Sequence, residues 1–122
     1  MVTAVTSFGR SGLYDWLIQR VSAVVLAAYT LFMVAYLVLN PDLTYTQWQG
    51  LFDQLWMRIF SFVTLISIVA HAWIGLWSVL TDYLTSRMMG GKAVVLRVLA
   101  QVCLGVVAVT YTIWGIEILW GL

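Results

Sequence analysis

The sequence predicts an all-α membrane protein with three transmembrane helices and one short interfacial helix, and two observations support this fold class. The first is composition: of 122 residues, 63% are hydrophobic and 9% are charged, and the mean hydropathy is +0.98. A soluble domain of this size has too much surface to hide so many apolar side chains. The second is the charge distribution, because no Asp, Glu, Lys or Arg occurs within residues 21–39, 59–81 or 98–116.

Each uncharged stretch contains 19 or more residues, and a spanning helix needs ~20. Strands of a membrane β-barrel alternate in polarity and have only about 10 residues, so the pattern favours helices over a barrel. The net charge of +1 gives no argument for nucleic-acid binding, and the single cysteine, Cys103, excludes an internal disulfide. We expect one membrane domain over residues 1–122, with helix one at about 16–39, an interfacial helix at about 44–56, helix two at about 57–82 and helix three at about 94–120.

The segment after helix one predicts the interfacial helix. Helix one ends at Asn40-Pro41-Asp42, because proline has no backbone donor and interrupts a helix. Thr44 and Gln47 then form the pattern of a capping box, in which threonine caps a new helix and glutamine reaches back to it. Apolar residues follow this cap at helical spacing: Trp48, Leu51, Phe52, Leu55 and Trp56. We expect this helix to lie on the membrane surface and to run into helix two.

The basic residues predict the orientation of the helices in the membrane. Before helix one and between helices two and three the basic residues are Arg10, Arg20, Arg87, Lys92 and Arg97. The first loop instead contains Asp42 and Asp53, with Arg58 at its far end. By the positive-inside rule, the N-terminus faces the cytoplasm and the C-terminus faces the periplasm.

A polar stripe runs along helix two around His71, the only histidine in the chain. Residues at helical spacing from His71 share one face of the helix. They are Thr64, Ser67, Gly75, Ser78 and Asp82. A stripe of small and polar residues in a spanning helix faces protein or a cavity rather than lipid.

Three interpretations of this stripe remain open. In the first, His71 forms a hydrogen bond to a neighbouring helix and only supports packing. In the second, His71 and Asp82 relay protons in a small homo-oligomeric transporter. In the third, His71 ligates haem iron, with Gly75 giving clearance for the porphyrin. Arg20, expected at the same level as Asp82, then binds haem propionates or is simply a positive-inside residue.

Three segments of the chain resemble a known family. "HAWIGLWSVLTDY" (71–83) is similar to the central motif of the hydrophobic membrane anchor of bacterial succinate dehydrogenase. "LYDWLIQRVSAVVL" (13–26) and "LTYTQWQGLF" (43–52) resemble the start and the first loop of the same family. The resemblance covers nearly the whole chain. It implies half of a six-helix anchor in the bacterial inner membrane, with a second three-helix anchor subunit as the other half.

The resemblance also implies cofactors, partners and roles. The family carries an iron–sulfur subunit and a flavoprotein subunit on the cytoplasmic face, holds one haem b between its two anchor subunits, and passes electrons to ubiquinone. His71 corresponds to the axial haem ligand contributed by this subunit, Arg20 to an arginine near the propionates, Tyr83 to the quinone-binding tyrosine, and Asp82 to its neighbouring carboxylate in proton supply. The second axial ligand comes from the partner, and this chain alone does not oxidise succinate. A fumarate reductase-type anchor is the alternative within the class.

One segment departs from the family pattern. The stretch from Leu84 to Lys92 includes Met88-Met89-Gly90-Gly91 and is longer than the family's turn after the Asp-Tyr pair. The difference lies next to the expected quinone site. Glu117, near the end of helix three, has no role that the resemblance supplies.

Overall fold

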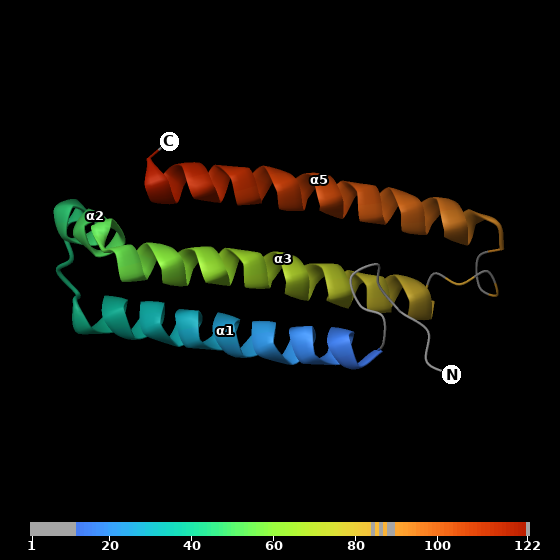
Figure 1. Cartoon of the computed structure of the whole chain (residues 1–122), viewed down its shortest axis with the longest axis horizontal. Helices are drawn as coiled ribbons and strands as arrows, with labels where there is room; N and C mark the ends of the chain where they lie inside the picture. Colours follow the sequence, from blue (N-terminus) through green and yellow to red (C-terminus); the bar gives the residue numbers. More distant parts are fainter. Residues whose placement is uncertain (1–11, 84, 86, 88–89, 122) are drawn as a thin grey trace.

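In the part of the chain that the structure describes, three long helices and one short helix form the fold, as the sequence predicts. The computed structural model describes residues 12–83, 85, 87 and 90–121. Three parts of the chain that the sequence analysis used lie outside the described residues: Arg10, Leu84 and Met88-Met89. The helices are α1 (Gly12–Leu39), α2 (Tyr45–Asp53), α3 (Leu55–Tyr83) and α5 (Lys92–Trp120) (Figure 1). Helices α1, α3 and α5 are each long and apolar enough to cross a membrane.

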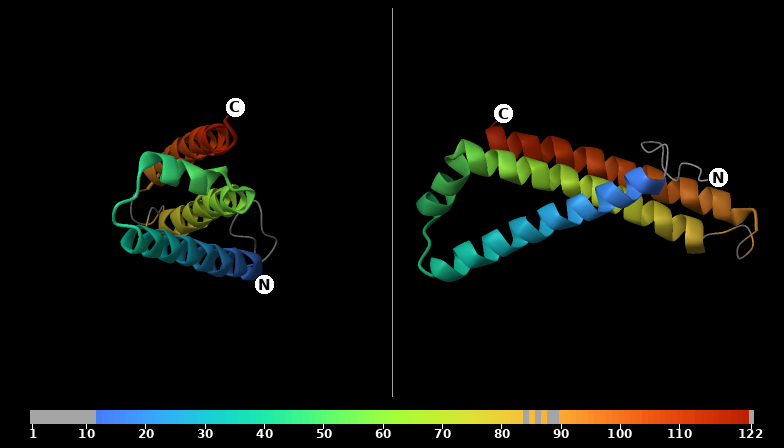
Figure 2. Two further views of the ribbon diagram at one scale, coloured as in Figure 1. Left: turned by 90° about the vertical axis from the view of Figure 1, so that its left-hand side faces the viewer. Right: turned by 60° about the horizontal axis from the view of Figure 1, so that its bottom comes forward.

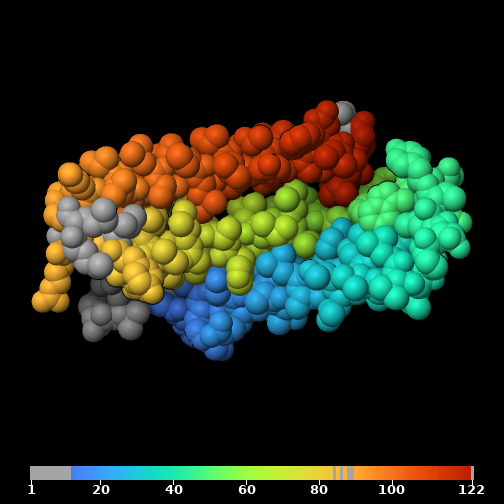
Figure 3. Space-filling view, turned by 180° about the vertical axis from the view of Figure 1, so that it is seen from behind, coloured from blue at the N-terminus to red at the C-terminus, as the bar shows by residue number. Residues whose placement is uncertain are grey.

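Helix α3 lies between the other two long helices (Figure 1). The start of α1, the end of α3 and the start of α5 lie at one end of the molecule, and α2 lies at the other, near the end of α5. Helix α1 crosses α3 at an angle, so the two separate toward α2, which spans the gap between them (Figure 2). In the space-filling view, α5 follows α3 along most of its length (Figure 3).

The interfacial helix begins with the predicted capping box. The Thr44 side chain accepts a hydrogen bond from the backbone N–H of Gln47, and the Gln47 side chain accepts one from the backbone N–H of Thr44. The helix ends at Asp53, earlier than expected, because Gln54 has an extended backbone with φ −73° and ψ 131°. This one residue separates α2 from α3, and Leu55 and Trp56 therefore belong to α3.

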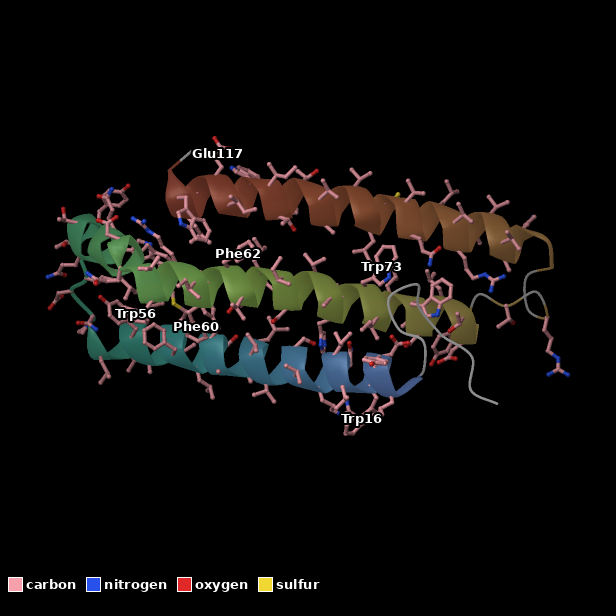
Figure 4. The ribbon with its side chains drawn as sticks, in the orientation of Figure 1. Trp16, Trp56, Phe60, Phe62, Trp73 and Glu117 are labelled. Atoms are coloured by element: carbon pink, nitrogen blue, oxygen red, sulfur yellow. The ribbon has the colours of Figure 1, made fainter. Side chains whose placement is uncertain are left out.

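Aromatic side chains fill the widening gap between α1 and α3. Phe32 of α1 makes edge-on contacts with Trp56 and Phe60 of α3, at ring-centroid distances of 5.8 and 6.0 Å. Trp56 and Phe60 lie on the α1 side of α3 (Figure 4). Tyr29 adds a third edge-on contact with Phe60, and its hydroxyl lies 2.8 Å from the Ser61 hydroxyl. This end of the pair is thus joined by rings and one hydrogen bond.

Helix α5 contacts α3 through apolar side chains. Gly115 of α5 meets Leu65 so closely that a β-carbon at Gly115 would collide with the leucine side chain. Phe62 points from α3 toward α5 (Figure 4), and its ring lies edge-on to Trp120 at 5.6 Å. Glu117 points away from α3 on the exposed side of α5. A glycine therefore sets the close approach of these two helices.

Candidate functional site

His71 points from the middle of α3 toward α1, where two polar side chains meet its ring. Nδ1 lies 3.0 Å from the Ser22 hydroxyl oxygen. Nε2 lies 3.5 Å from the side-chain amide nitrogen of Gln19. Ser22 is only 4% exposed, and the imidazole itself is half-buried. The intramembrane histidine is therefore held by the first helix of its own chain.

The part of the polar stripe that precedes His71 is buried, whereas Ser78 and Asp82 are exposed. Ser61, Thr64 and Ser67 are all buried, and Gly75 has the Gln19 side chain as its neighbour. Thr64 donates its hydroxyl proton to the Phe60 carbonyl, as threonine commonly does one turn back in a helix. The prediction that this face meets protein rather than lipid is confirmed near His71. The face is met by α1, within one chain.

The surroundings of His71 fit a haem ligand. Nδ1 is hydrogen-bonded to the neighbouring helix α1, and Nε2 lies 3.5 Å from the end of a flexible side chain. That side chain belongs to Gln19, whose buried amide oxygen has no hydrogen-bond partner among the residues that the structure describes. A β-carbon at Gly75 would meet nothing within 4 Å except the Gln19 amide, at 3.7 Å. If Gln19 turns away, Nε2 and the surface of Gly75 become accessible together.

Arg20 lies deeper than the sequence analysis expected. Because α1 begins at Gly12 and Gln19 contacts His71, the adjoining Arg20 lies closer to His71 than to Asp82. Asp82 is ~16 Å further along α3 at 1.5 Å per residue. The Arg20 guanidinium is exposed and stacks on the Trp16 ring at 5.3 Å, so its charge points away from the α1–α3 contact.

Asp82 and Tyr83 are the last two residues of α3, at its exposed end. Both are exposed, Tyr83 by 65%. Within the described part of the chain, neither of them bonds to His71 or Arg20. The structure therefore contains two separate groups: an enclosed one around His71, and an exposed carboxylate and phenol at the end of the helix.

Sequence reasoning missed the α1 half of the His71 group. Asp15, Gln19, Ser22 and Tyr29 lie at helical spacing and form a polar stripe on α1. Asp15 and Ser22 are the two buried residues of that helix. The signal was present, since a carboxylate, an amide and a hydroxyl on one face of a spanning helix need polar neighbours. The sequence analysis predicted contact with protein only for the polar stripe on α3.

Comparison with known proteins places similarity over almost the whole chain. Residues 3–113 match the family model described as succinate dehydrogenase/fumarate reductase transmembrane subunit. A succinate dehydrogenase hydrophobic membrane anchor subunit of Coxiella burnetii is 38% identical over 91% of this chain and 90% of its own length. A protein of the same description from Rickettsia prowazekii is 24% identical over 75% of this chain and 73% of its own.

Proposed function

Because this chain belongs to the succinate dehydrogenase/fumarate reductase transmembrane subunit family, we propose that it supplies one axial ligand to a haem b and part of a ubiquinone site. It is a membrane anchor subunit of succinate dehydrogenase. Its proposed partners are a second three-helix anchor subunit, which provides the other ligand, an iron–sulfur subunit and a flavoprotein subunit. The two anchors together form a six-helix unit in lipid.

The observation that best supports the haem role is that the two imidazole nitrogens of His71 have different partners. Ser22 engages Nδ1, and Nε2 remains as the ligating nitrogen once Gln19 turns aside. Arg20 has a long side chain near the level of His71 and can turn from Trp16 toward a carboxylate such as a propionate. Haem, when bound, supplies one-electron chemistry. His71 fixes its position, and the α1–α3 contact excludes water from one side of the ligand.

Tyr83 and Asp82 carry the proposed quinone role. Reduction of a quinone adds two electrons and two protons, and negative charge develops on its carbonyl oxygens. The Tyr83 hydroxyl can donate a hydrogen bond to such an oxygen, and the adjacent carboxylate can pass on protons from water. Their exposure at the end of α3 supports access for both a lipid-soluble substrate and a neighbouring subunit.

The proposed orientation follows the basic residues. Arg87, Lys92 and Arg97 lie beyond the end of α3 and at the start of α5, on the side of the molecule where α1 begins. By the positive-inside rule this side faces the cytoplasm of a bacterium, and α2 faces the periplasm. The N-terminus is then cytoplasmic and the C-terminus periplasmic. The exposed Asp82 and Tyr83 lie on the side where soluble electron-carrying subunits would dock.

Replacement of His71 in the assembled complex tests the haem role. We expect His71→Ala to abolish or strongly reduce the dithionite-reduced b-haem band, while the chain still inserts, because insertion depends on the apolar runs. Cys103→Ala, an exposed position on α5, is the matched control and should keep the band. A normal band and midpoint potential in His71→Ala would refute the ligand assignment and leave His71 as a packing residue.

Quinone assays test the second role separately. In Tyr83→Phe we expect normal haem content and normal succinate oxidation by a soluble artificial acceptor, with slower reduction of a short-chain ubiquinone. A hydrogen bond to a developing oxyanion contributes at most about 2.7–4 kcal/mol, and water at this exposed position replaces part of it. Asp82→Asn should slow the same step, increasingly as pH rises and protons become scarce. Wild-type quinone kinetics in both variants would place the quinone elsewhere.

A further inference from the structure

We propose that Ser22 is a positioning residue for His71: its hydroxyl oxygen accepts the Nδ1 proton, and thereby holds the imidazole in the tautomer whose Nε2 can bind iron. The inference rests on the proposed haem role of His71 and extends it to a residue of a different helix. It follows from three contacts within one turn of α1.

The first step concerns the single proton of the serine hydroxyl. Ser22 donates this proton to the Gln19 backbone carbonyl of its own helix, at 3.1 Å. A hydroxyl has one proton and two lone pairs. With the proton already given to α1, the oxygen meets Nδ1 of His71 at 3.0 Å as an acceptor. The proton between the two residues therefore belongs to Nδ1.

The second step concerns the other ring nitrogen. The Gln19 amide nitrogen can only donate, so at 3.5 Å from Nε2 it requires an unprotonated Nε2. Both contacts thus select the same neutral tautomer, with a proton on Nδ1 and a lone pair on Nε2. If the Gln19 amide were reversed, its oxygen would instead accept a proton from Nε2 and select the opposite tautomer. Gln19 would then oppose the tautomer that Ser22 selects.

The third step concerns rigidity. Ser22 is 4% exposed and sits in the body of α1, with its hydroxyl oriented by the Gln19 carbonyl. Water competes little at such a position. A metal-ligating histidine usually donates its second N–H to a fixed acceptor, which orients the ring and makes the ligating nitrogen more basic. Ser22 has the location, the burial and the lone pair for this task.

A more basic ligand stabilises ferric over ferrous haem. Loss of the hydrogen-bond acceptor makes His71 less basic and therefore raises the midpoint potential of the haem. Ser22→Ala should weaken haem binding by about 10–100-fold, the usual cost of losing such a partner. If the affinity for ferric haem falls tenfold more than the affinity for ferrous haem, the midpoint potential rises by ~59 mV for this one-electron couple. Alanine is a better helix former than serine, so a loss of helix stability cannot produce the effect.

The test is a redox titration and an electron paramagnetic resonance spectrum of haem in the assembled complex. The variants are Ser22→Ala, Ser22→Thr and Tyr29→Phe. Threonine keeps the hydroxyl and should restore the wild-type midpoint and spectrum. Tyr29→Phe removes a hydrogen bond between α1 and α3 that does not involve His71, the one to Ser61, and is the control for packing. It should leave both readouts unchanged.

The outcomes separate the inference from the proposed function. A raised midpoint in Ser22→Ala, rescued in Ser22→Thr, supports positioning by Ser22. An unchanged midpoint and haem content in Ser22→Ala, or equal shifts in Ser22→Ala and Tyr29→Phe, overturns it, while loss of haem in His71→Ala still supports the ligand. Normal haem in His71→Ala overturns both. If Ser22→Ala does not assemble, Ser22→Cys, whose sulfur accepts weakly, decides by the same midpoint criterion.

Discussion

Helix α3 contacts a neighbour on each side, and the two contacts are built from different side chains. On the side that faces α1, helix α3 has hydroxyls and the imidazole, and these form hydrogen bonds with side chains of α1, namely Ser22, Gln19 and Tyr29. Toward α5 it presents Leu65 and Phe62, which meet a glycine and a tryptophan ring. Hydrogen bonds join the first pair of helices in addition to aromatic contacts, whereas close approach of apolar groups joins the second.

The difference shows where the chain can position a reactive group. Hydrogen bonds fix a ring nitrogen in orientation and protonation state, and apolar contacts fix only distance. Among the described residues of α5, Ala93 alone is buried, and Gly115, which approaches α3, is half-buried. The α1–α3 contact, which orients the imidazole, is where we propose that haem binds.

The largest expected effect comes from filling the space beside His71. Gly75→Leu puts a side chain where only the Gln19 amide now lies, 3.7 Å from the position that a β-carbon would take. We expect it to lower haem affinity by about 10–100-fold, comparable to disruption of a metal ligand's support. Haem content per purified complex, from the reduced spectrum, measures the effect. Gly105→Leu is the control, because a β-carbon there meets nothing within 4 Å.

Equal haem content in Gly75→Leu and Gly105→Leu would show that Gly75 does not border the haem. It would also weaken the contrast between the two contacts, since substitution of a glycine in α3 would then have no more effect than substitution of one in α5. A loss in both variants would instead indicate that the complex tolerates no enlargement of these helices. Only a loss confined to Gly75 supports the assignment.

The sequence predicted the polar stripe of α3 but not that α1 is the helix that contacts it. Helical spacing around His71 identified the α3 stripe, because periodicity within one helix is a local property. Which helix meets that stripe depends on the crossing of two helices, and spacing within one helix does not encode it. The sequence analysis allowed a hydrogen bond from His71 to a neighbouring helix, but it did not identify Ser22 or Gln19 as the partners, and it set Arg20 level with Asp82.

The sequence predicted local hydrogen-bond patterns more reliably than the depth of a residue in the membrane or the end of a helix. The capping box at Thr44 and Gln47 formed as predicted, because its two hydrogen bonds join residues three apart. The end of α2 was not predicted, since Gln54 has no feature that marks an extended residue between two helices. The roles of His71, Arg20, Asp82 and Tyr83 stay predictions that spectra and kinetics must decide.

A second prediction concerns the apolar contact. Gly115→Leu collides with Leu65, and overpacking of this kind typically costs about 1–3 kcal/mol. We expect lower resistance of the complex to heating in detergent, with haem content per assembled complex unchanged. Gly105→Leu again serves as the control. Addition of Leu65→Ala should recover part of the loss, because it makes room for the new side chain.

Loss of haem in Gly115→Leu with full thermal resistance would contradict this division of roles. It would mean that α5 positions the haem site through α3 rather than anchoring the bundle. Failure of Leu65→Ala to recover any stability would point to a different collision. A lower resistance to heating that Leu65→Ala partly restores is the expected result.

The smallest expected effect separates a hydrogen bond that packs helices from one that positions a ligand. Tyr29→Phe removes the 2.8 Å bond to Ser61 but keeps the ring that contacts Phe60. Hydrogen bonds between membrane helices contribute on average ~0.6 kcal/mol, and the Ser61 hydroxyl can turn to its own helix, as Thr64 does. A double-mutant cycle of Tyr29→Phe and Ser61→Ala, followed by thermal resistance, should give a coupling of about that size. A coupling well above ~1.7 kcal/mol, the upper end for such bonds, would show that the aromatic end of the α1–α3 contact holds the pair together. The His71 end would then rest on that bond, and Tyr29→Phe would no longer serve as a pure packing control.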